Sequence, residues 1–428
     1  MLKRGKKKVG KLRRFFQKIG PGFITGASDD DPSGIATYSQ TGAKFGYTQS
    51  WMALFVLPFM TAIQEMCGRI GVVTGKGLAG VMRKHYSKSI LYFSVILLLI
   101  ANIVNIGADL GAMAASAQLL FGIPFVYLLL GITLFSVLLE IFVSYHRYVK
   151  VLKYLCLSLL AYIIVAFVIK IDWSQVLHFT FIPHLTFSKD YLFNIVAFLG
   201  TTISPYLFFW QTSEEVEEEV DRKVLKSMGK GIPRFNFSML REMRYDTLFG
   251  MFFSQLVTFF IVIVTAATLG ASGITDIQTA DQAALALKPL AGNFTYLLFA
   301  LGIVGVGLLA IPVLAGSASY ALAETFKQKE GLYLKFKQAH FFYAVITIAT
   351  VAGLLINFIH IPPFKMLYYA AVVNGIIAPA LMVVIMLISN NKEVMGNYTN
   401  SWKSNLLGWV ITGVMIACAV ALLVSVLV

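Results

Sequence analysis

Apolar residues fill long stretches of this chain, and short polar segments separate them. Eleven such stretches can be counted, and most reach about twenty residues, the length that an α-helix needs to cross the hydrocarbon core of a bilayer. The pattern therefore predicts an all-α polytopic membrane protein. The predicted spans are 15–47, 50–68, 89–117, 123–143, 149–169, 191–212, 246–270, 294–323, 339–358, 366–388 and 405–427.

The first and the sixth stretches are each interrupted by proline. Pro32 has no amide hydrogen, so the carbonyl of Ser28, four residues earlier, loses its helical partner. Asp and Gly are poor helix formers, and we expect the first helix to stop near Ser28 and to restart after Gly34. In the sixth stretch, Pro205 frees the carbonyl of Thr201 in the same way.

Two interrupted membrane helices in one chain are typical of a secondary transporter whose site lies at the middle of the bilayer. The alternative is a pair of proline kinks without a ligand, an interpretation that we keep for Pro58, Pro312 and Pro379. At the first break, however, three consecutive carboxylates follow Ser28 inside an apolar segment, and charge at membrane depth usually has a function. Because oxygen ligands suit hard cations, the pattern predicts a cation site there.

The two breaks lie five spans apart, and this spacing predicts the architecture. Because five is odd, a repeat of five spans enters the membrane from the opposite side the second time, which gives an inverted repeat with the two breaks facing each other. We predict a basic tail over residues 1–14, a first five-helix repeat over 15–169, an inverted second repeat over 191–388, and an additional eleventh helix over 405–427.

The composition agrees with a membrane protein. Of 428 residues, 58% are hydrophobic and 13% charged, and the mean hydropathy is +0.76. No soluble domain of enzyme size is left over. The three cysteines lie singly in different apolar segments, so neither a disulfide framework nor a Cys-x-x-Cys metal site is indicated. A cleavable signal peptide is not indicated either, since no small-residue cleavage site follows a short apolar run.

The net charge of +14 is best explained by membrane topology. Basic residues are spread between the spans and do not form one patch beside aromatic residues, so nucleic acid is not an expected partner. With the N-terminus in the cytoplasm, all but five of the 35 Lys and Arg lie on the cytoplasmic side, as the positive-inside rule requires. We expect a multi-pass protein of a bacterial inner membrane, with a cytoplasmic N-terminus and an extracytoplasmic C-terminus. The five exceptions are Lys44, Lys170, Lys189, Lys288 and Lys365.

Further polar residues leave alternatives open. Asp109 lies in the middle of the third span, with Asn102 on the same helical face, and is either a proton or ion relay or a buried acid with a hydrogen-bonded partner. The acidic run 214–221 is either a solvated helix end or a vestibule that concentrates cations. The six histidines fall in loops or at span ends, and the usual catalytic motifs are missing, so we do not expect an enzyme.

Several segments resemble the Nramp family of divalent-metal transporters. The similarity covers most of the chain and implies the LeuT-like inverted-repeat fold, alternating access, and a metal held by Asp31 with the carbonyls of Ser28 and Thr201. The first-helix motif of the family, Asp-Pro-Gly-Asn, appears here as Asp31-Pro32-Ser33-Gly34. The other matching segments are Gly20-Pro21-Gly22, Val72-Val73-Thr74-Gly75-Lys76, Ala108-Asp109-Leu110, and residues 200–205, where the family has Met-Pro-His.

Departures from the family pattern resemble its magnesium-transporting bacterial branch. Gly34 replaces a ligand asparagine and Ser204 a thioether methionine; losing sulfur removes a preference for soft metals, and a wider pocket suits Mg²⁺, which dehydrates reluctantly. Tyr206 and Gln211 stand where the family has histidines, and Asn102 and Ala112 replace two acids, so groups credited with proton movement are absent. Two more segments fit that branch, residues 312–317 and Asn374-Gly375.

We therefore expect a carrier of Mg²⁺, and of Mn²⁺, that works without obligatory proton coupling on a partly hydrated ion. The expected partners are the divalent metal ion as substrate and the lipid bilayer, with no cofactor and no obligatory protein partner. Asn374 offers its amide oxygen to the ion or bonds a neighbouring backbone group, and we favour the second. The candidate metal-site residues are Asp31, Ser28, Thr201, Ser204, Gly34, Thr202, Asp30 and Asn374.

Three rival functions remain. The first is a proton-coupled Mn²⁺/Fe²⁺ transporter of the main Nramp type, for which strong competition by Cd²⁺ is expected. The second is a LeuT-like amino-acid symporter, which three consecutive aspartates at the break argue against, because they would repel an anionic headgroup. The third is a membrane receptor that senses Mg²⁺ without carrying it.

Overall fold

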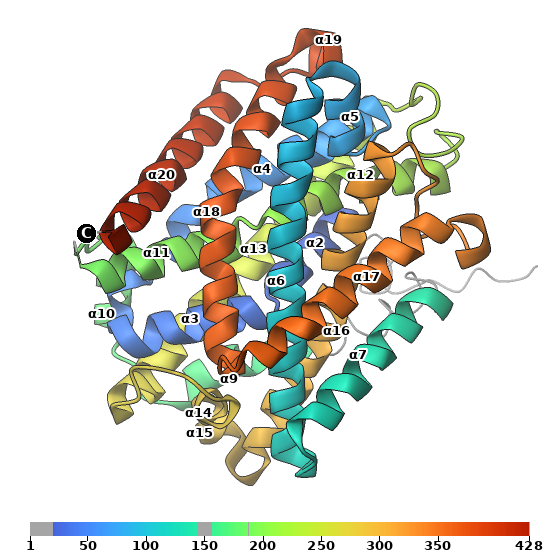
Figure 1. Cartoon of the computed structure of the whole chain (residues 1–428). Coiled ribbons are helices and arrows are strands. Elements are labelled where there is room, and N and C mark those ends of the chain that lie inside the picture. Colours follow the sequence, from blue (N-terminus) through green and yellow to red (C-terminus); the bar gives the residue numbers. More distant parts are fainter. Residues whose placement is uncertain (1–19, 144–155, 187, 428) are drawn as a thin grey trace, which may run out of the picture.

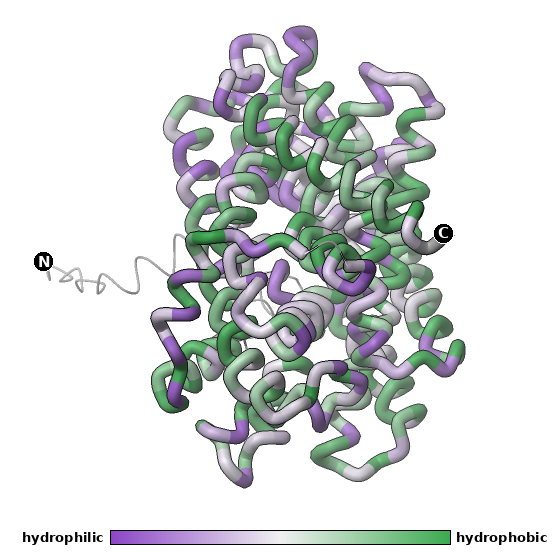
Figure 2. Tube along the Cα trace, turned by 90° about the vertical axis from the view of Figure 1, so that its left-hand side faces the viewer, coloured by the Kyte–Doolittle hydropathy of each residue, from purple (hydrophilic) through white to green (hydrophobic). Residues whose placement is uncertain are grey.

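The computed structural model describes residues 20–143, 156–186 and 188–427, and every regular element within them is helical. Figure 1 shows long helices packed side by side, with α20 along one edge of the bundle and α7 along another. In Figure 2, hydrophobic residues predominate along the helices and hydrophilic residues gather in many of the connecting segments. Nine helical stretches in the described residues are long and apolar enough to cross a membrane.

These nine stretches correspond to nine of the eleven predicted spans. The remaining two are the first, which is divided into two short helices, and the fifth, whose start lies outside the described residues. The whole of the predicted basic tail also lies outside them. The long helices are α4 (Trp51–Thr74), α6 (Lys88–Phe121), α7 (Phe125–Phe142), α13 (Phe237–Thr268), α16 (Thr295–Thr325), α17 (His340–Ile356), α18 (Pro363–Asn390) and α20 (Trp402–Leu427).

Two helices are broken, as the proline argument predicts. The first consists of α2 (Pro21–Asp29) and α3 (Pro32–Phe45), and the second of α11 (Lys189–Thr202) and α12 (Pro205–Asp221). Across the bundle, α2 contacts α12 and α3 contacts α11. Each first half thus packs on the second half of the other helix, which is the pairing of two antiparallel broken helices whose breaks lie side by side.

Short helices connect the long ones and were not expected from the hydropathy pattern, because four to nine residues leave too weak a periodic signal. The described part of the fifth span is α9 (Leu160–Val168), preceded by one turn of 3₁₀ helix. The remaining short α-helices are α5 (Leu78–His85), α10 (Trp173–Phe181), α14 (Ala280–Ala284), α15 (Lys288–Ala291) and α19 (Lys392–Met395).

Glycines allow the broken helices to pack closely against their neighbours. A Cβ built on Gly200 of α11 would lie 2.1 Å from the carbonyl oxygen of Ala371 in α18, and one built on Gly26 of α2 would lie 2.3 Å from the backbone of Gly250 in α13. Both approaches are too short for any side chain. The two breaks are therefore held in a rigid surrounding of α13 and α18.

Candidate metal centre

The first break is shorter than predicted. α2 ends at Asp29 and α3 begins at Pro32, so only Asp30 and Asp31 lie outside the helices. The prediction that the helix restarts after Gly34 is wrong, because Asp31 acts as an N-cap: its Oδ1 accepts hydrogen bonds from the amide of Gly34 at 2.8 Å and from the hydroxyl of Ser33 at 2.6 Å. Proline is favoured in the first turn, where its missing amide hydrogen costs nothing.

The second break leaves Ile203 and Ser204 between α11 and α12, with Pro205 again in the first helical position. Ser204 donates its hydroxyl back to the end of α11, with its Oγ 2.9 Å from the carbonyl oxygen of Gly200 and 2.7 Å from that of Thr201. These carbonyls belong to the last turn of α11, whose helix dipole favours positive charge.

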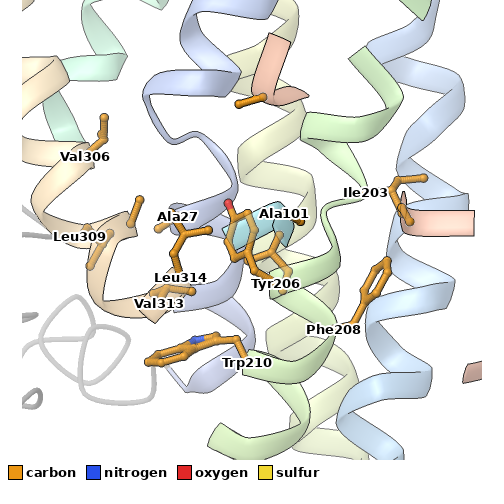
Figure 3. Close-up of a cluster of buried hydrophobic side chains, with 14 of the residues drawn as sticks. Ala27, Ala101, Ile203, Tyr206, Phe208, Trp210, Val306, Leu309, Val313 and Leu314 are labelled. Carbon is orange, nitrogen blue, oxygen red and sulfur yellow. The ribbon is translucent and has the colours of Figure 1, made fainter. Parts of the chain in front are cut away.

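Side chains from the first turns of α3 and α12 join the two breaks. The Ser33 hydroxyl lies 3.1 Å from the Thr201 hydroxyl, and the Tyr206 hydroxyl lies 3.0 Å from the Ser28 carbonyl oxygen. Figure 3 shows Tyr206 extending from α12 to Ala27, the residue before Ser28. Asp31 and Thr201 are each about 1% exposed, so this centre is closed to solvent.

Seven of the eight predicted site residues divide into two groups. Asp31, the Ser28 carbonyl, Thr201, Ser204 and Gly34 come together at this centre. Thr202 and Asp30 lie at its border: the Thr202 hydroxyl is 3.2 Å from that of Tyr38, and Asp30 points its Oδ1 to Ser254 of α13.

Asn374 of α18 is held by a side chain. Its Oδ1 accepts a hydrogen bond of 2.8 Å from the amide of Asn105 in α6, whereas we favoured a bond to a neighbouring backbone group. That expectation is wrong, because Asn105 lies directly opposite on the packed face between α6 and α18. Asn374 is fully buried, and its own amide nitrogen has no hydrogen-bond partner among the described residues.

Asp109 is a fully buried acid of α6. Neither of its carboxylate oxygens has a hydrogen-bond partner within the described residues, and its electrostatic neighbours are Asp31 and Tyr206. Asn102, expected on the same face, instead donates to the Leu314 carbonyl and the Ser317 hydroxyl of α16. The interpretation of Asp109 as a buried acid with a hydrogen-bonded partner is therefore wrong for the described residues. Its role as a proton or ion relay stays a prediction.

Comparison with known proteins identifies the family of this chain. A family model described as Nramp, natural resistance-associated macrophage protein-like, matches residues 22–425. The chain belongs to the Nramp family. It is 24% identical over 409 residues to the divalent metal cation transporter MntH of Klebsiella pneumoniae (strain 342), which covers 93% of this chain and 92% of the relative.

Solved structures with a similar fold are also found. A crystal structure of a manganese transporter from Eremococcus coleocola has a TM-score of 0.74 at 17% identity and covers 97% of this chain and 88% of its own. Mhp1, a nucleobase-cation-symport-1 family transporter, was solved in an inward-facing conformation that has a TM-score of 0.56 at 11% identity and covers 95% and 89% of the two chains. These likenesses confirm the LeuT-like fold that the sequence resemblance implied.

The acidic end of α12 in this Nramp protein is largely buried. Glu214, Glu215, Glu217 and Glu219 are at most 6% exposed, so the expectation of a solvated helix end is wrong. Glu217 accepts hydrogen bonds from the Tyr320 hydroxyl and the amide of Leu332. Beside this end, α2, α4, α12 and α13 line an open cavity of about 790 Å³. The carboxylates that line this cavity belong to Glu215, Glu218, Glu219, Glu242 and Asp246.

Ser33 and Tyr206 are the site residues that we did not predict. Each directly follows a break-forming proline, Pro32 or Pro205, and so lies on the first helical turn after a break, next to the backbone groups that end the preceding half-helix. That position is a usable signal. The donors that come together at this centre are one carboxylate with hydroxyl and carbonyl oxygens. No group of three or more His, Cys, Asp or Glu that could hold a metal occurs in the described residues.

Proposed function

We propose that this Nramp protein is a secondary transporter of divalent cations that carries Mg²⁺, and also Mn²⁺, into the cell by alternating access and without obligatory proton coupling. The observation that carries the proposal is the donor set between the two breaks. Asp31 supplies the one carboxylate, and neutral oxygens come from the Ser28 and Thr201 carbonyls. Hard oxygen ligands with few charges suit an ion that keeps part of its water shell.

The relatives support the transport of a divalent metal, since one is a divalent metal cation transporter and another a manganese transporter. Two residues favour magnesium. Ser204 offers a hydroxyl where a methionine thioether would favour soft transition metals, and Gly34 has only a hydrogen where an asparagine would supply a further ligand. Tyr206 and Gln211 line this half of α12, and neither side chain exchanges a proton near neutral pH in its unperturbed form.

Alternating access requires that the closed centre opens to each side in turn. In the orientation given by the basic residues, the 790 Å³ cavity lies on the cytoplasmic side and is lined by the first turn of α2. Moving α2 away from α12 would connect this cavity to Asp31. The contact to be broken is the one between the Tyr206 hydroxyl and the Ser28 carbonyl.

The test is an uptake assay with purified protein in liposomes that reads Mg²⁺, Ca²⁺, Cd²⁺ and luminal pH side by side. We expect saturable Mg²⁺ uptake, weak competition by Cd²⁺, and no acidification of the lumen. Acidification in step with metal influx would refute the uncoupled mechanism, and the absence of any Mg²⁺ flux would refute the proposed substrate.

The second candidate is a proton-coupled Mn²⁺ transporter. Asp109 favours it, because a buried carboxylate without a hydrogen-bond partner in the described residues, next to Asp31, is suited to hold a proton. In the same liposomes this candidate requires that the lumen acidifies with Mn²⁺ influx and that an Asp109→Asn variant no longer shows the acidification.

A further inference from the structure

Asp29 and Asp30 direct carboxylate oxygens to α13, outside the two broken helices. Both face α13, where the Ser254 hydroxyl lies 2.7 Å from Asp29 Oδ2 and 3.3 Å from Asp30 Oδ1. The second oxygen of each, Asp29 Oδ1 and Asp30 Oδ2, has no hydrogen-bond partner among the described residues. Both side chains are at most 1% exposed. Two buried carboxylates thus share one donor and each keep a free oxygen.

The hydroxyl of Thr258 lies beside this pair of carboxylates. Thr258 lies one turn after Ser254 on the same face of α13, and its hydroxyl lies against the Asp30 carboxylate and the Tyr38 phenol. A buried threonine in a helix usually bonds the carbonyl four residues earlier, as Thr265 of the same helix does with Ile261. Thr258 is fully buried and makes no such bond.

Charge balance indicates what these oxygens hold. Asp29, Asp30 and Asp109 each lie within electrostatic range of Asp31, and no ion pair recorded for the described residues includes any of the four. One divalent ion at Asp31 offsets two of the four negative charges. The others need protons or a second cation, because buried charge is otherwise very costly.

A cation explains the free oxygens better than protons do. A neutral Asp29 could donate its hydrogen from Oδ2 to the Ser254 hydroxyl oxygen, 2.7 Å away, but Asp29 Oδ1, Asp30 Oδ2 and the Thr258 hydroxyl would still have no hydrogen-bond partner within the described residues. A cation needs only oxygen lone pairs, and carboxylates with hydroxyls are ligands for a hard divalent ion.

We propose a second divalent-cation subsite between the first break and α13, formed by Asp29, Asp30, Ser254 and Thr258. This proposal rests on the proposed function, because the subsite takes the same ion as the Asp31 centre. Tyr38 contacts residues of both sites, with its hydroxyl 3.2 Å from that of Thr202 and beside that of Thr258. The subsite holds an ion that has left, or is about to enter, the Asp31 centre.

The experiment measures equilibrium binding of Mn²⁺ to the purified full chain in detergent, from the electron paramagnetic resonance signal of free Mn²⁺. Wild-type protein should bind two Mn²⁺ per chain, the Asp29→Asn/Asp30→Asn double variant one, and an Asp31→Ala variant one. Thr258→Val keeps the side-chain shape and should weaken the second site about tenfold. The control is Thr265→Val, the same change on the same helix, whose hydroxyl bonds only its own helix.

One Mn²⁺ per wild-type chain, unchanged in the double variant and in Thr258→Val, would overturn the subsite. So would a double variant that changes only the number of protons released on binding, because the pair would then hold protons. The two proposals fail separately. Two bound Mn²⁺ without Mg²⁺ flux in liposomes refutes the transport function alone, whereas Mg²⁺ flux with one bound Mn²⁺ refutes the subsite alone.

Discussion

The Tyr206 hydroxyl lies 3.3 Å from Asp31 Oδ2, and 3.0 Å from the carbonyl oxygen of Ser28. One phenol thus occupies two of the oxygens that the proposed metal ion would use. The ion and the phenol compete for the same lone pairs, and the structure described here is the one in which the phenol has them. Binding of the ion and separation of α2 from α12 are therefore coupled.

Replacing Tyr206 by Phe tests this competition. Without the hydroxyl, the buried Ser28 carbonyl loses its partner, so the metal-free protein should lose about 1–3 kcal/mol of stability. A metal ion supplies the missing interaction. We expect a lower unfolding temperature than wild type without Mg²⁺ and a larger rise on adding saturating Mg²⁺, measured by thermal unfolding in detergent. An equal rise in both proteins would show that the phenol and the ion use different oxygens.

Removing the charge of Asp31 should abolish transport. In the Asp31→Asn variant the amide oxygen still accepts the hydrogen bond of Gly34, so the N-cap of α3 is kept while the carboxylate is lost. Uptake of Mg²⁺ into liposomes should fall to the level of empty liposomes. The control is Asp172→Asn, the same change at the exposed N-cap of α10, where uptake should equal that of wild type. Substantial flux through Asp31→Asn would place the ion elsewhere.

The positions of both breaks follow from covalent chemistry and so were predictable. A proline cannot return a hydrogen bond to the carbonyl four residues earlier, whatever the rest of the chain does. Ser28 and Thr201 were found in this way. The error at Gly34 was avoidable, because Asp31 before Pro32 is a strong N-terminal signal for a helix that begins at the proline.

Contacts across the bundle were not predictable from local pattern. Nothing in the residues near Asp30 indicates that Ser254, more than two hundred positions later, lies beside it. The prediction of a solvated helix end for the acidic run on α12 is wrong for a related reason. A row of glutamates indicates contact with water, and the sequence does not show which helices cover it. Glu217 is buried because Tyr320 of α16 and the segment at Leu332 close over it.

Introducing sulfur at Ser204 should change the metal preference. Ser204→Met places a thioether beside the Thr201 carbonyl, and soft ligands favour Cd²⁺ over Mg²⁺. We expect the Cd²⁺ concentration that halves Mg²⁺ uptake to fall by about tenfold, which corresponds to about 1.4 kcal/mol of added binding. Ser204→Ala separates the two effects of the change, because it removes the hydroxyl without adding sulfur. If both variants respond alike to Cd²⁺, the side chain at this position does not contact the ion.

Close packing of α11 on α18 should make Gly200 intolerant of any side chain. A Cβ there would lie 2.1 Å from the Ala371 carbonyl oxygen and 2.2 Å from the amide nitrogen of Gly375, both rigid backbone atoms. Gly200→Ala should therefore cost about 1–3 kcal/mol or more of stability. Gly131 of α7 has no atom within 4 Å of a built Cβ, and Gly131→Ala should be neutral or stabilising by up to about 1 kcal/mol. The measurement is thermal unfolding of both variants in detergent. Equal midpoints for Gly200→Ala and Gly131→Ala would contradict the close packing of α11 on α18.

Glu330 lies outside the membrane-spanning helices and should make stability depend on pH. Burial, and secondly the nearby Glu324 carboxylate, raises the pKa of Glu330 well above its ordinary value. The folded protein then binds a proton that the unfolded chain has already released. Its contribution to stability is complete below the unfolded pKa of about 4.3 and is lost as the pH rises through the folded pKa.

A Glu330→Gln variant stays neutral at every pH and avoids this loss. We expect its unfolding temperature to match that of wild type near pH 4.5 and to exceed it increasingly as the pH is raised to 8. The matched control is Glu393→Gln, at an exposed position in the first turn of α19. Its unfolding temperature should differ from that of wild type by nearly the same small amount at every pH. A constant offset between Glu330→Gln and wild type over this range would mean that Glu330 is ionised in the folded protein as it is in the unfolded chain, and that burial alone does not hold its proton.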